Sequence, residues 1–212
     1  MEILPRISSL YSEAWVGWVM FALFAIAMLG MIPQAAGATL QTIFSRAERT
    51  YSVRTRHWVS EITLRLFRVG VLALALLIWV LPQGGATLLS YAKVLGVLAA
   101  IYTLQTLLMY AVGGVFLSAK RMDVAMEQYS AIRTLLCITM YPILLLLTNI
   151  SLPALPKIAF GIIFGLYFVA LLAKSVQMFY TNILSVLYIL LYIVCLEVLP
   201  IMVSLAVAER II

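Results

Sequence analysis

Glu197 is the residue whose type and position most clearly suggest chemistry. It is a carboxylate inside the long apolar run 183–207. A charge at membrane depth costs several kcal/mol unless it is neutralised or paired, so such a residue normally faces the interior of a helical bundle. We therefore predict an intramembrane polar site around Glu197.

Four further polar side chains are the predicted neighbours of this carboxylate. Lys93 lies about six residues into its apolar stretch and Glu197 about ten, so at about 1.5 Å of rise per residue their depths differ by roughly 6 Å. That difference is within reach of a lysine side chain. Tyr192, Tyr188 and Gln105 would add polar lining. Two interpretations stay open: a carboxylate linked to proton or substrate transport, and a structural ion pair or clamp between helices.

Other candidate sites in the sequence are weaker. Asp123 and Glu127 are four residues apart, but neither His nor Cys supports them as a metal site, and Arg133 lies nearby. This pattern favours a solvated, salt-bridged helix face. His57 is the only histidine and lies among arginines, whereas a histidine metal site needs further ligands. We predict no metal and no cofactor.

The sequence also lacks the signatures of common enzymes. It contains no G-x-S-x-G, H-E-x-x-H, C-x-x-C or P-loop, which argues against the usual hydrolase, zincin, thioredoxin-like and NTPase sites. Cys137 and Cys195 both fall within apolar stretches, so we expect buried hydrophobic thiols and no disulfide. The protein is predicted not to be an enzyme.

Composition indicates that the bilayer is the solvent of this chain. Apolar residues make up 65% and charged residues 10% of 212 residues, against about 45–50% and about 25% in soluble domains. The chain leaves no room for a separate soluble domain, so residues 1–212 are expected to form one integral membrane domain. Its formal charge of +6 is concentrated in loops, which points to lipid headgroups and not to nucleic acid.

A transmembrane helix needs about 20 mainly apolar residues. Six stretches approach or exceed this length: 14–34, 64–81, 87–117, 134–152, 158–176 and 183–207. The predicted fold is therefore an all-α, polytopic transmembrane bundle of about six spans.

The distribution of Lys and Arg predicts the orientation of the bundle. Ten of these residues fall on one side and three on the other, with Lys93 inside a span. Basic residues favour the cytoplasmic side, so both termini are predicted to be outside the cytoplasm, in a bacterium in the periplasm. The ten are Arg46, Arg49, Arg54, Arg56, Arg65, Arg68, Lys120, Arg121, Arg133 and Lys174; the three are Arg6, Lys157 and Arg210.

The connection between the first two spans has the pattern of a basic amphipathic helix. Apolar residues recur there at helical spacing, with arginines between them. Such a helix would lie in the headgroup layer and present its basic face to anionic lipids or a partner protein. A solvated connector is the alternative. The apolar residues are Leu40, Ile43, Phe44, Ala47, Tyr51, Trp58, Ile62 and Leu66, and the arginines are Arg46, Arg49, Arg54 and Arg56.

The C-terminal stretch resembles a known signature. Residues 187–200 read Leu-Tyr-Ile-Leu-Leu-Tyr-Ile-Val-Cys-Leu-Glu-Val-Leu-Pro. This is similar to the tyrosine-rich end, running into Cys-Leu-Glu-x-Leu-Pro, of an uncharacterised family of polytopic inner-membrane proteins from Bacteroidota. The family is classed as a domain of unknown function. The resemblance implies a bacterial inner-membrane location and importance of Glu197, without supplying an activity.

Together these features favour a non-enzymatic inner-membrane subunit or accessory factor of a larger envelope complex, in contact with other membrane subunits. The main alternative is a small transporter or proton-coupled carrier that uses Glu197. A lipid-modifying membrane enzyme ranks third, because the sequence offers no recognisable nucleophile and base.

The predicted topology can be tested with a Thr50→Cys variant. We expect an impermeant thiol reagent to leave this cysteine unlabelled in intact cells and to label it after lysis, because the basic connection should be cytoplasmic. A Glu209→Cys variant, on the opposite side, is the control and should be labelled in intact cells. Labelling of the Thr50→Cys variant before lysis would contradict the predicted orientation.

Overall fold

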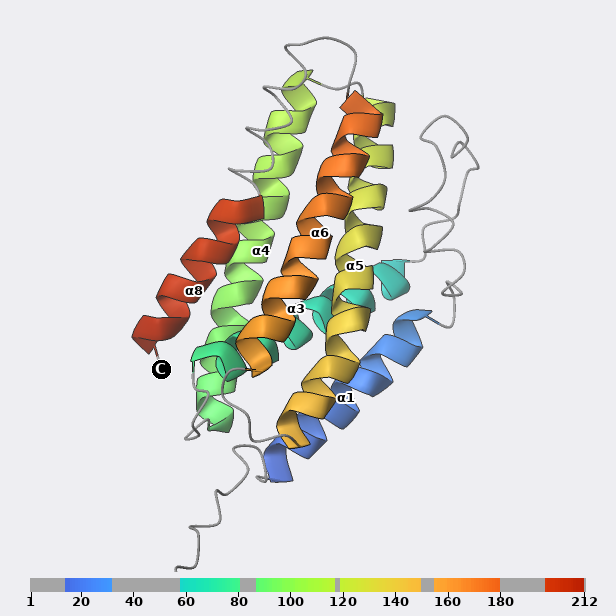
Figure 1. Ribbon diagram of the computed structural model, residues 1–212. Coiled ribbons are helices and arrows are strands. Elements are labelled where there is room, and N and C mark those ends of the chain that lie inside the picture. The colour runs from blue at the N-terminus through green and yellow to red at the C-terminus, as the bar shows by residue number, and fades with distance from the viewer. Residues whose placement is uncertain are drawn as a thin grey trace, which may run out of the picture.

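The computed structural model describes residues 14–31, 58–80, 87–116, 119–149, 155–179 and 197–211. Within these ranges the chain forms helices and no strand, which confirms the predicted all-α membrane bundle (Figure 1). The helices are α1 (Ala14–Met31), α3 (Trp58–Val80), α4 (Leu88–Phe116), α5 (Ala119–Asn149), α6 (Leu155–Phe179) and α8 (Leu199–Ile211). A helix suits a bilayer because it satisfies its backbone hydrogen bonds internally.

Four of the described helices contain a stretch long and apolar enough to cross a membrane. These stretches are Ser60–Val80, Leu88–Ala111, Met126–Thr148 and Lys157–Gln177. They correspond to the second to fifth predicted spans. The apolar stretch of α1, Ala14–Gly30, is shorter, and the last predicted span is described only from residue 197.

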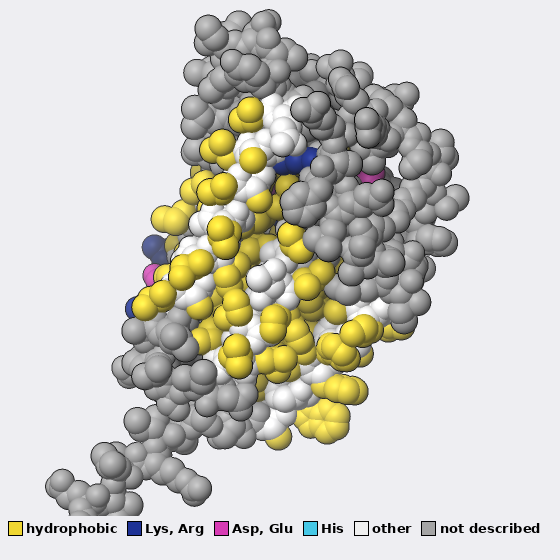
Figure 2. Space-filling view, turned by 45° about the vertical axis from the view of Figure 1, so that its right-hand side comes forward, with side chains coloured by type: hydrophobic (Ala, Val, Ile, Leu, Met, Phe, Trp, Pro, Cys, Tyr) yellow, Lys and Arg dark blue, Asp and Glu magenta, His cyan; other side chains and the backbone are white. Residues whose placement is uncertain are grey.

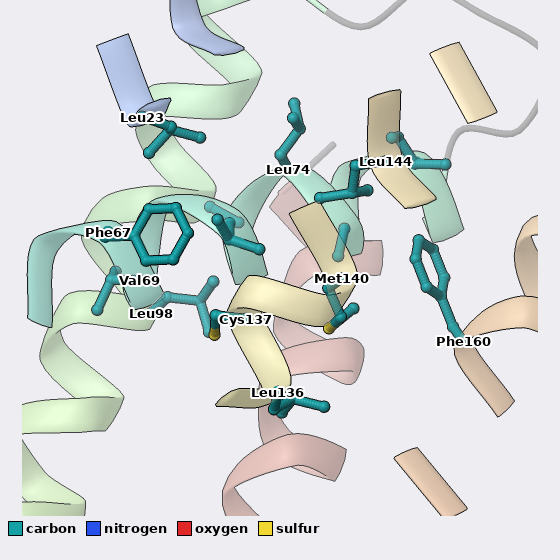
Figure 3. Close-up of a cluster of buried hydrophobic side chains, with 14 of the residues drawn as sticks. Leu23, Phe67, Val69, Leu74, Leu98, Leu136, Cys137, Met140, Leu144 and Phe160 are labelled. Carbon is teal, nitrogen blue, oxygen red and sulfur yellow. The ribbon is translucent and has the colours of Figure 1, made fainter. Parts of the chain in front are cut away.

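Helix α3 is at the centre of the bundle. It contacts α1, α4, α5, α6 and α8, and it passes obliquely behind α4, α5 and α6 in Figure 1. Its side chains Val71, Ala73, Leu74 and Leu77 have no exposed surface. The surrounding cluster includes Phe67 from α3, Met140 and Leu144 from α5, and Phe160 from α6 (Figure 3).

Helices α1 and α3 approach each other closely at two glycines. A Cβ added to Gly70 would lie 2.4 Å from Leu23, and one added to Gly30 would lie 2.9 Å from Leu64. The hydroxyl of Ser60 donates a hydrogen bond to the backbone oxygen of Gly30 at 2.7 Å. Small residues that bring backbones together, with a hydroxyl bridging two helices, are typical of packing in membranes.

The outer surface of the bundle is apolar, as expected for contact with lipid. Figure 2 shows hydrophobic side chains over most of the described surface on that face, with few charged groups. Large exposed hydrophobic residues lie on α4 and α6 in particular: Leu104, Leu107, Leu108, Ile158, Ile162, Leu166, Val169 and Leu172. A soluble monomer rarely exposes so many contiguous apolar side chains.

Two apolar spans begin several residues earlier in the structure than predicted. The apolar stretch of α3 begins at Ser60 and that of α5 at Met126, whereas the predicted starts were residues 64 and 134. Ile62 and Leu66, assigned to an interfacial helix, therefore belong to α3, where both are exposed. Most of the predicted interfacial helix, with Arg46, Arg49, Arg54 and Arg56, lies outside the described residues.

Candidate functional site

Glu197 is buried and bound by two donors from different helices. Its side chain is 3% exposed and lies just before α8. The Arg133 guanidinium of α5 donates through Nη2 to Oε1 in a buried ion pair. The Tyr167 hydroxyl of α6 donates to Oε2 at 2.8 Å. One carboxylate therefore connects α5, α6 and the segment that leads into α8.

The predicted pairing of Glu197 with Lys93 is wrong. Lys93 is exposed on α4, and Arg133 occupies the position of the cation. The prediction compared depths along two spans and had no information on which way each side chain points around its helix. It also placed Arg133 at the membrane edge, whereas the residue lies about two turns inside the apolar stretch of α5.

Of the other predicted neighbours of Glu197, one lies in the described part of the chain and two do not. Gln105 is 5% exposed and lines a cavity together with Glu197. Tyr188 and Tyr192 lie outside the described residues, as do His57 and Cys195. Cys137 is a buried free thiol, as predicted.

Aromatic and sulfur groups complete the surroundings of Arg133. Its guanidinium carbon lies 5.3 Å from the centre of the Tyr102 ring, and Nη2 lies 3.5 Å from the Met109 sulfur. The guanidinium carbon of Arg68 also lies over the Tyr102 ring, 5.9 Å from its centre. A cation over an aromatic face is stabilised electrostatically, more strongly when it is removed from water. The Tyr102 ring thus stabilises two arginines in the bundle.

A mostly apolar cavity of about 70 Å³ adjoins the ion pair. Its polar lining comes from Tyr102, Gln105, Arg133, Tyr167, Glu197 and Ser204, and its apolar lining includes Leu72, Leu76, Phe164 and Ile201. The Tyr102 hydroxyl is buried and has no hydrogen-bond partner within the described part of the chain. Since a buried water needs about 10–15 Å³ and polar partners, the cavity has room for several waters or a small ligand beside the carboxylate.

The described residues contain no group of three or more His, Cys, Asp or Glu side chains placed to hold a metal ion. Asp123 is exposed and Glu127 is partly exposed on α5. Neither of these two carboxylates lines the cavity beside Glu197.

Arg133 and Arg68 are parts of the site that the sequence pattern did not predict. Both were counted as cytoplasmic charges, yet Arg133 is 8% and Arg68 is 2% exposed. One signal could have found Arg133: a lone buried carboxylate requires a cation, and Arg133 adjoins an apolar stretch at residue 134. Lys174, also counted as a surface cation, is buried as well.

The ion pair can be tested with a double-mutant cycle on the purified protein. Glu197→Leu and Arg133→Leu should each lower the free energy of unfolding by about 3 kcal/mol or more, because each leaves the other charge buried without its partner. The double variant should lose less than the sum of the two. Glu209→Leu, an exposed position on α8, should change stability by about 0.5 kcal/mol at most. Strictly additive losses would show that the two charges do not interact.

Comparisons with known proteins identify a family for this chain but no activity. The family described as "Domain of unknown function (DUF4271)" matches residues 12–208, which include Arg133, Tyr167 and Glu197. Neither the curated proteins nor the solved structures that were compared with the chain contain a match. Because the match covers nearly the whole chain, the protein belongs to the DUF4271 family, a family of unknown function.

Proposed function

We propose that this protein is a non-enzymatic subunit or accessory factor of a larger protein complex in a bacterial inner membrane. The membrane-spanning helices and the family of unknown function are compatible with this role. The proposal keeps the predicted orientation, with both termini in the periplasm, and the Bacteroidota origin that the C-terminal stretch suggests.

The observation that carries the proposal is an outward-facing pair of glycines on α6. Gly161 and Gly165 are four residues apart, and a Cβ added to either would meet nothing within 4 Å. Their neighbours Ile158, Ile162 and Leu166 are exposed. Small residues at this spacing let a second helix approach closely in a membrane, where association depends on packing. Since no described helix of the bundle packs against this glycine pair, the pair suits a helix of another subunit.

The Glu197 ion pair gives independent support for a fixed scaffold. Both carboxylate oxygens accept hydrogen bonds, from Arg133 on α5 and Tyr167 on α6. Separating these helices would leave charges unpaired inside the membrane, which is costly. Such an arrangement favours a bundle that keeps its shape and presents constant outer faces.

Substitution of the glycine pair tests the proposed helix contact. The Gly161→Leu/Gly165→Leu variant should purify with unchanged thermal stability, because neither position is packed in the bundle, but should lose partners that co-purify with the wild type from native membranes. Gly96→Leu, on α4 and also without neighbours within 4 Å, is the matched control and should keep them. A wild type without any reproducible partner, or a double variant that retains its partners fully, would contradict the proposal.

A proton-coupled carrier is the second candidate, and the cavity beside Glu197 is the observation that favours it. The carboxylate lines a cavity of about 70 Å³ that also reaches Gln105 and Ser204. A carrier needs a titratable group next to a space for water or substrate, and this arrangement provides both.

Proton flux into liposomes separates the two candidates. If the carboxylate is structural, wild-type protein and the Glu197→Gln variant should give the same low flux, since the amide can still accept a hydrogen bond. The Gln variant must first be shown to fold by its thermal transition. The carrier would be favoured over the subunit if the wild type gave a flux well above that of empty liposomes and the folded Gln variant did not.

A further inference from the structure

Arg68 is a buried cation whose acceptors in the described helices are neutral. Its side chain is 2% exposed, and its Nη1 donates to the backbone oxygen of Ser130 at 3.0 Å and to the Ser130 hydroxyl at 2.9 Å. Its Nε is buried and has no hydrogen-bond partner among the described residues. This N–H donor is therefore left without an acceptor in the described bundle, which is costly for a charged group away from water.

The neighbouring arginines, by contrast, have carboxylates. Arg65 pairs with Glu61 at 2.6 Å, one helical turn away, and Arg133 pairs with Glu197. Among the described residues around this part of the bundle, Arg68 is the arginine without a carboxylate. The Tyr102 ring, at 5.9 Å, stabilises this cation only in part, because an aromatic face carries no net charge.

A polar pocket of about 30 Å³ lies next to Arg68. It is separate from the apolar cavity but shares Tyr102 and Arg133 with it. Three arginines, Glu61 and five residues that carry hydroxyl groups line the pocket, and two of the lining residues, Arg65 and Tyr110, are exposed. The volume corresponds to about two waters, enough for two oxygens of a carboxylate or phosphate group. The five hydroxyl-bearing residues are Tyr102, Thr106, Tyr110, Tyr129 and Ser130.

The pocket lies where the apolar stretches of three helices begin or end. Arg68 is within about two turns of the start of the α3 stretch, and Ser130 is close to the start of the α5 stretch. Thr106 is close to the end of the α4 stretch. Since consecutive spans alternate in direction, these three ends belong to one side of the membrane. Lipid phosphates lie just outside the hydrocarbon core, and Glu61, one residue after the start of the α3 stretch, brings the outer end of the pocket near that level.

We propose that Arg68 binds the oxyanion of an acidic ligand, a phosphate or carboxylate group, in the pocket between α3, α4 and α5. The guanidinium supplies the charge and a planar set of donors that matches such groups. Ser130 fixes the orientation of the guanidinium through Nη1 and leaves its other donors to the ligand. The site is independent of the proposed role of α6. An anionic lipid headgroup and a soluble oxyanion share this chemistry, and the experiment distinguishes them.

The test measures thermal stabilisation of the full chain in bilayer discs. In the lipid arm, phosphatidylglycerol is titrated into phosphatidylcholine discs. In the soluble arm, inorganic phosphate or acetate is added to phosphatidylcholine discs, with chloride at equal ionic strength as the control. Stabilisation of the wild type in the lipid arm alone identifies a headgroup, and stabilisation by phosphate or acetate identifies a soluble ligand.

The Arg68→Gln substitution should lower the affinity for the stabilising ligand by about tenfold or more, as expected for the loss of a charge-assisted hydrogen bond. Arg210→Gln removes the same charge at an exposed position on α8 and should bind as the wild type does. Arg68→Lys keeps the charge without the planar fork and should bind with intermediate strength, which provides a second variant if the Gln variant does not fold.

Two outcomes would contradict the proposed oxyanion site at Arg68. The first is a wild type that phosphatidylglycerol, phosphate and acetate all fail to stabilise beyond their controls, a result that needs no variant. The second is stabilisation of equal size in the wild type and in a folded Arg68 variant, which would assign the effect to general surface charge.

Discussion

The ion pair between Arg133 and Glu197 is the constraint on which the arrangement of the bundle depends. Either charge alone would be costly at membrane depth, and together they are tolerated because each satisfies the other. Tyr167 adds a second donor to the carboxylate. The side chains can meet in this way only if α5, α6 and the start of α8 keep a fixed rotation and depth relative to one another. Apolar packing alone specifies such a register less strictly, because lipid and protein interior are similarly apolar.

The fold was predicted well from the sequence because hydrophobic stretches of membrane length are a direct signal. The α3, α4, α5 and α6 helices were all expected, with errors of several residues where arginines lie near the start of a span. These errors have a physical cause. Arg133 was taken as the polar end of α5, and Arg68 was counted as a cytoplasmic charge although it falls in the predicted span 64–81. Carboxylate, hydroxyl and aromatic partners allow both arginines to lie inside the bundle.

The site was predicted only in part, because a sequence gives depth more readily than direction. Glu197 was identified from its apolar surroundings, and Gln105 was correctly placed near it. The cation that pairs with Glu197 was not identified. The choice between Lys93 and Arg133 depends on the faces of α4 and α5 on which they lie, and the sequence did not give these faces. The central position of α3 was also beyond reach, because five helices contact it and helix hydrophobicity does not reveal which neighbours a helix has.

Tyr102 links the two polar regions of the bundle. Its ring contacts both Arg68 and Arg133, and its side chain lines both the small polar pocket and the larger apolar cavity. An anion bound at Arg68 would reduce the repulsion between the two guanidinium groups that share this ring, because its charge would lie close to both. It would also compete with Glu197 for the charge of Arg133, which lines the same pocket. The proposed ligand and the ion pair would therefore oppose each other through Tyr102 and Arg133, the two residues that both polar regions share.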